Sequence, residues 1–170
     1  MIYEILLLRF LHVLGGIFWL GGGLFMSVFL VPALAKSGMN AGPVFAALQQ
    51  RRLFAVLPAV AVLVILSGLR LLSIASGDSS SYLRSTSGRT FAVSGALAVI
   101  AFLMSLIVAR PANVRLASLG AAVAAAAGHE RAALVGQVAV LQRRIAVSSM
   151  VATACLVLCG VGMSVARYLP

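Results

Sequence analysis

The chain has 170 residues, of which 62% are hydrophobic and only 9% are charged, and its mean hydropathy is +1.13. Soluble domains carry charge on about a quarter of their residues, so this composition excludes a water-soluble domain and indicates an integral membrane protein. The formal charge of +10 does not favour nucleic-acid binding, because the thirteen basic residues stand singly or in pairs at the ends of apolar runs. Such residues flank membrane helices and can also hold anionic lipid headgroups.

Four apolar runs are each long enough to cross a bilayer, which takes about 20 residues. They predict membrane helices over residues 3–35, 53–75, 89–110 and 145–168. Pro32 marks the exit of the first helix, and Pro111 is predicted to stop the third. Residues 38–50 predict a small interfacial helix, and residues 76–82 form a polar loop.

The segment 112–144 is less hydrophobic than the four runs. It is rich in alanine up to Ala127, is interrupted at Gly128, and then places apolar residues at helical spacing from Leu134 to Ile145. This pattern predicts an amphipathic helix, a turn, and a second helix that continues directly into the fourth membrane helix. The predicted fold is therefore all-α: one membrane domain over residues 1–170, a four-transmembrane-helix bundle with a cytoplasmic helical segment between the third and fourth helices.

The orientation follows from the basic residues of the loops. The connections after the first and third helices carry eight (Lys36, Arg51, Arg52, Arg110, Arg115, Arg131, Arg143 and Arg144), and the opposite side carries three (Arg84, Arg89 and Arg167). The positive-inside rule then places both termini outside. We expect a multi-pass protein of the bacterial inner membrane with periplasmic termini.

The first apolar run contains the residues most suggestive of a function. His12, Gly16, Trp19, Gly23 and Met26 fall on one helical stripe. An imidazole, an indole and a thioether on one face make no specific favourable contact with lipid, so this stripe is expected to face other helices or a bound group. A plain hydrogen bond from His12 to a neighbouring helix is the competing interpretation.

Three sulfur-containing residues form a second stripe in the last helix: Cys155, Cys159 and Met163, at positions i, i+4 and i+8. Counting inward from the outer ends of the two helices places Cys159 near the depth of His12. If the stripes face each other, imidazole, thiolate and thioether converge in the outer leaflet, a set of ligands that suits Cu(I). The alternative is that cysteine and methionine simply fill the apolar interior.

His12 is also a candidate haem ligand. The only other histidine, His129, is predicted on the inner side, which argues against a bis-histidine haem within one chain and leaves Met163 or Met104 as the second ligand. Arg9 and Arg70 lie near His12, and two interpretations of them are open. They form a clamp that binds an anion such as a haem propionate, or they extend to the lipid headgroups while Glu4 neutralises one of them.

The segment from Phe10 to Gly22, the pair Val31-Pro32 and the closing segment from Met163 to Leu169 resemble the CopD-like group of small four-helix bacterial membrane proteins, with the HemJ-like proteins as distant relatives. The resemblance implies copper handling with His12 at the matching first-helix position, whereas HemJ-like members are linked to haem and protoporphyrinogen oxidation. No catalytic motif and only three acidic residues are present, which does not favour an enzyme.

Three hypotheses follow. The first is a CopD-like protein that binds or passes copper through His12, Cys155, Cys159 and Met163. The second is an accessory subunit of a larger membrane electron-transfer complex, associated with other membrane subunits or with a second copy of itself. The third is a b-type haem protein with His12, Arg9, Arg70 and Trp19 around the cofactor.

Overall fold

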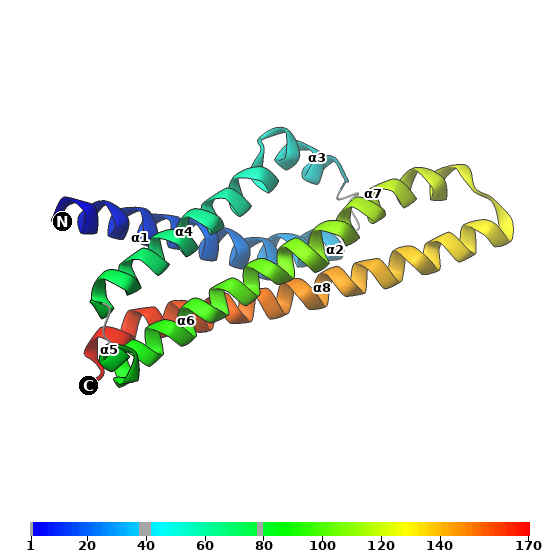
Figure 1. The fold of residues 1–170 in the computed structure, drawn as a ribbon. Coiled ribbons are helices and arrows are strands. Elements are labelled where there is room, and N and C mark those ends of the chain that lie inside the picture. Colours follow the sequence, from blue (N-terminus) through cyan, green and yellow to red (C-terminus); the bar gives the residue numbers. More distant parts are fainter. Residues whose placement is uncertain (1, 38–41, 78–79) are drawn as a thin grey trace.

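The computed structural model describes residues 2–37, 42–77 and 80–170 (Figure 1). The described residues are helical almost throughout and contain no strand. The prediction of an all-α protein is therefore confirmed. The elements are α1 (Ile2–Leu24), η1 (Phe25–Leu30), α2 (Val31–Lys36), α3 (Gly42–Gln50), α4 (Leu53–Ser76), α5 (Ser80–Arg84), α6 (Thr86–Leu103), η2 (Met104–Ala109), α7 (Arg110–Ala125), α8 (Gly128–Val165) and η3 (Ala166–Tyr168).

Four of the described helical stretches are long and apolar enough to cross a membrane: Ile2–Lys36, Leu53–Ser76, Thr86–Ala125 and Gly128–Tyr168. The shortest has 24 residues, which at about 1.5 Å per residue exceeds the roughly 30 Å of a hydrocarbon core. The protein is therefore a multi-pass membrane protein, as the sequence predicts. Many of the large apolar side chains on these helices are exposed, as lipid-facing residues must be.

Successive membrane helices run in alternating directions, and the strongest packing is of α1 against α4 and of α6 against α8. Both termini and α5 lie at one end of the molecule, here called the terminal end (Figure 1). At the other end, α7 and the first part of α8 project side by side as a helical hairpin, here called the arm. The arm turns at Ala126 and Ala127, and Gly128 begins α8 with a φ of +57°.

The interior is built mostly from small side chains, which let helices approach closely in the absence of a strong hydrophobic force between them. The buried core cluster comprises Trp19, Ala61, Val64, Ala98, Ala101, Ala152 and Leu156. At Gly15, an added Cβ would lie only 2.7 Å from Cγ2 of Val64, so α1 and α4 are in contact there through glycine. Helix–helix packing thus explains much of the glycine content of the first run.

The prediction that Pro111 stops the third helix is wrong. The helix continues through α7 to Ala125, and a π-helical segment, η2, lies directly before the proline. The Arg110 N–H bonds to the Ser105 carbonyl, five residues earlier. Because proline lacks an N–H and its ring crowds the carbonyl four residues before it, a widened turn at this point lets the helix continue. The same arrangement precedes Pro32, where the Val31 N–H bonds to the Met26 carbonyl.

Candidate functional site

His12 lies against α4 and is held there by a hydrogen bond. Its Nδ1 is 2.9 Å from the Val64 carbonyl oxygen and 3.3 Å from the Ser67 hydroxyl. A carbonyl oxygen can only accept, so the Nδ1 nitrogen carries the proton and donates it. In the neutral imidazole, the Nε2 nitrogen then presents its lone pair. A histidine with one nitrogen bound to a carbonyl is also the usual form of a metal ligand.

The neighbouring residues of α4 pack closely against the imidazole ring of His12. Ser67 is buried and donates its hydroxyl to the Val64 carbonyl at 3.0 Å. Gly68 lies directly under the ring, where an added Cβ would come within 2.7 Å of Cε1 and 3.1 Å of Nδ1 of His12. The ring therefore occupies the place that a larger residue at position 68 would need. The Ser67-Gly68 pair in the second apolar run is the sequence signal for this contact.

Trp19 and Gly16 have different surroundings, although both share the stripe of His12. Trp19 is in the buried core cluster, where its ring packs between helices. A Cβ added at Gly16 would meet nothing within 4 Å. Open space therefore lies beside α1 one turn from His12, toward the middle of the bundle. The structure places Trp19 as a core residue of the interior.

The ionisable residues near His12 form an ion pair between α1 and α4. Arg70 donates from Nε and Nη2 to Oε1 of Glu4, at 2.9 and 2.7 Å. The two side chains are 55% and 42% exposed, which places the pair at the surface of the terminal end. Arg9 is exposed and has no ion pair among the described residues. Of the two arrangements considered for these residues, the structure has the one in which Glu4 neutralises Arg70.

The contacts between α1 and α8 fix the level of the sulfur-containing residues. Gly160 lies opposite Leu20, Leu156 lies opposite Gly23, and the Ser27 and Thr153 hydroxyls are 2.9 Å apart. This antiparallel register places Cys159 level with residue 21 of α1, which is about 13 Å from His12 at 1.5 Å per residue. Cys155 is about 20 Å away on the same count. Metal–ligand bonds are only about 2.0–2.3 Å long, so the cysteines and His12 do not meet at one ion.

The three sulfur residues are each turned by about 40° from the one before, so the two ends of their stripe face different neighbours. Met163 continues the stripe of Leu156 and Gly160, which face α1. Cys155 instead lies on the stripe of Gly162, where an added Cβ would overlap the Ser94 hydroxyl of α6, and Cys159 lies between the two stripes. Both cysteines are partly buried against the core cluster and are free thiols. Met163 is therefore the one of these three sulfur residues nearest to the level of His12, about 7–8 Å from it along the bundle axis.

A two-histidine haem does not fit within one chain. His129 is in the first turn of α8, exposed at the tip of the arm, whereas His12 is near the terminal end (Figure 1). Among the residues that the structure describes, no group of three or more histidine, cysteine or carboxylate side chains is placed to hold a metal ion. A metal or haem site on this chain would thus depend on His12 together with methionine or with ligands from another molecule.

Comparison with protein-family models, with curated proteins and with solved structures finds no match.

Proposed function

We propose that this protein is a CopD-like membrane protein that binds copper through Nε2 of His12 and the thioether of Met163. The observation that carries the proposal is the hydrogen bond from Nδ1 to the Val64 carbonyl, because it fixes the ring and leaves Nε2 with a lone pair for a metal. Imidazole and thioether together suit Cu(I) better than harder ions.

The position of Met163 supports this assignment. It lies on the α1-facing stripe of α8, and the register of the two helices places it level with residue 17 of α1, next to Gly16, where an added Cβ would meet nothing within 4 Å. Both side chains are long, and methionine is flexible enough to reach an ion held by a fixed imidazole. The cysteines are left out of the proposed site, because the register places both of them farther from His12 than Met163. Ligands from a second copy or another membrane subunit can complete the coordination.

The proposed location is the bacterial inner membrane, with the terminal end facing the periplasm and the arm in the cytoplasm. Eight basic residues lie at the arm end or in the connection beside it, against five at the terminal end: Arg9, Arg70, Arg84, Arg89 and Arg167. Positive residues remain on the cytoplasmic side during insertion. On this orientation, copper would be bound in the outer half of the bundle.

A substitution that separates the two nitrogens of His12 tests the proposal. In His12→Asn, the amide can still donate to the Val64 carbonyl, but no group replaces Nε2. We expect purified wild-type protein to bind Cu(I). The His12→Asn and Met163→Leu variants should each lose at least about tenfold in affinity for Cu(I). The control Cys155→Ser/Cys159→Ser should bind Cu(I) as the wild type does. Competition with a chromophoric Cu(I) chelator measures the affinity. Equal binding by wild type and His12→Asn would reject the copper assignment.

The second candidate is an accessory subunit of a larger membrane complex. The specific observation in its favour is the outer surface of α1, where Phe10, Val13 and Ile17 are 61%, 55% and 64% exposed. Such a surface can receive another membrane helix as well as lipid. Isolation without copper, but in a stoichiometric complex from mild detergent, would favour this function. A Soret band in the same preparation would instead assign His12 to a haem.

A further inference from the structure

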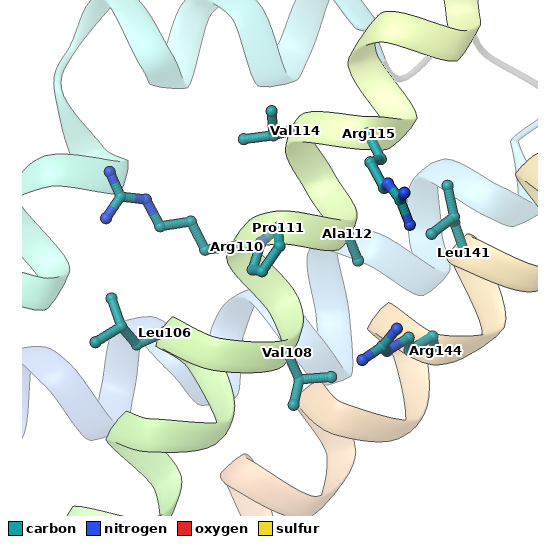
Figure 2. Close-up of a pocket in the computed structure, with 9 residues that line it drawn as sticks. All are labelled: Leu106, Val108, Arg110, Pro111, Ala112, Val114, Arg115, Leu141 and Arg144. Atoms are coloured by element: carbon teal, nitrogen blue, oxygen red, sulfur yellow. The ribbon is translucent and has the colours of Figure 1, made fainter.

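A pocket lies at the base of the arm, far from His12. It has a volume of about 470 Å³ and lies where η2 passes into α7 and faces α8. Its apolar lining includes Leu106, Val108 and Leu141, and its charged lining consists of Arg110, Arg115 and Arg144 (Figure 2). The pocket therefore combines an apolar part and a strongly basic part.

Two of the arginines approach the pocket from different helices. Arg115 extends from α7 and Arg144 from α8, and both side chains enter the space between these helices, whereas Arg110 points to the other side of α7 (Figure 2). Two guanidinium groups directed into one space repel each other unless an anion lies between them. The paired helices α7 and α8 hold them in this arrangement.

No acidic residue of the described chain neutralises this pair. Among the described residues, the ion pair of Arg70 with Glu4 is at the terminal end, at the opposite end of the bundle. Glu130 is in the first turn of α8, fourteen positions from Arg144, or about 21 Å along the helix. The counter-ion must therefore come from outside the chain.

The sequence places this pocket at a membrane boundary. Residues 90–109 and residues 145–166 contain no charged side chain; Arg110 directly follows the first run, and Arg144 directly precedes the second. Each run has the length of one membrane crossing. The guanidinium groups consequently lie at headgroup depth, and the apolar lining from Leu106 and Val108 lies next to the acyl chains.

We propose that this pocket binds the phosphate headgroup of an anionic phospholipid of the leaflet at the arm end. Arginine binds phosphate through two parallel hydrogen bonds, so Arg115 and Arg144 together can hold the phosphate oxygens. The apolar part receives the first segment of an acyl chain, which a free phosphate ion lacks. The proposal is independent of copper binding and concerns residues at the other end of the bundle.

Native mass spectrometry of the full chain, released from nanodiscs, tests the proposal with phosphatidylglycerol as the probe and phosphatidylcholine as the reference lipid. We expect the wild type to retain phosphatidylglycerol selectively. Arg115→Gln/Arg144→Gln should reduce retention at least about tenfold, because charge-assisted hydrogen bonds are lost. The matched control Arg131→Gln/Arg143→Gln removes the same charge from arm positions that are exposed, as Arg115 and Arg144 are, but lie outside the pocket, and it should retain the lipid.

Equal losses in the two double variants would show a diffuse charge effect and overturn the site. If the glutamine variant does not fold, Arg115→Lys/Arg144→Lys keeps the charge but not the paired hydrogen bonds. This variant should still lose about threefold or more, and full retention would overturn the proposal. Inorganic phosphate, added to protein in phosphatidylcholine nanodiscs, should not bind at millimolar concentration, and binding there would overturn the assignment to a lipid.

Discussion

Replacing Gly68 with alanine tests directly how closely His12 packs on α4. The new Cβ would lie 2.7 Å from Cε1 of the ring, whereas carbon atoms prefer a separation of about 3.5–4.0 Å. The ring must therefore retreat by about 1 Å. That movement breaks the 2.9 Å bond from Nδ1 to the Val64 carbonyl.

The magnitude follows from three contributions. Loss of an interhelical hydrogen bond in a membrane costs about 0.6–1.7 kcal/mol, and overpacking costs about 1–3 kcal/mol. Alanine returns about 1 kcal/mol through its higher helix propensity. We expect Gly68→Ala to lower the free energy of unfolding by about 0.6–3.7 kcal/mol in total. Circular dichroism during titration with sodium dodecyl sulfate in mixed micelles measures this change.

Gly16→Ala is the matched control, because a Cβ there meets nothing within 4 Å. It should be neutral or stabilise the protein by up to about 1 kcal/mol. In the His12→Ala background the ring is absent, so adding Gly68→Ala should cost nothing further. A Gly68→Ala protein as stable as Gly16→Ala, or an equal cost with and without the ring, would refute this account of the contact.

Two further predictions concern the packing of α8 and the orientation of the chain. Gly162→Ala should destabilise the protein, because the new Cβ overlaps the Ser94 hydroxyl. Adding Ser94→Ala in the double variant should restore at least half of the lost free energy of unfolding. The same unfolding titration measures both variants, and absence of this rescue would contradict the contact. Cysteine labelling tests the orientation. The native cysteines are first removed in a Cys155→Ser/Cys159→Ser background, and Ala127→Cys or Leu169→Cys is then introduced as the single labelling position. A membrane-impermeant maleimide should label position 169 in intact spheroplasts and position 127 only after permeabilisation, and the reverse pattern would invert the proposed topology.

Much of the fold could be predicted because composition alone determines where lipid must surround the chain. The four runs are separated by charged and turn-forming residues, and the helices of the structure follow them. Composition does not predict whether the third helix continues past Pro111. Whether a proline stops a helix depends on the hydrogen bonds of the preceding turn, and nothing in the side chains of residues 104–109 announces the π-helical pattern of η2.

The candidate site was harder to predict, because it depends on how far neighbouring helices are shifted along each other. Counting from the helix ends assumes that the first and fourth helices end flush, which placed Cys159 level with His12. The contacts of Leu20 with Gly160 and of Ser27 with Thr153 establish a different register. The hydrogen-bond partner of His12 could not be predicted from hydrophobic periodicity either, because Val64 contributes a backbone carbonyl and not a side chain.

The continuity of α8 has a mechanical consequence. It is a single helix of 38 residues, about 57 Å long, that reaches from the tip of the arm to the terminal end without a proline. The opposing stretch of the third helix contains η2 and Pro111 at the base of the arm. A lateral push on the tip would therefore bend the molecule at η2, and α8 would act as a lever that carries the displacement to its contacts with α1.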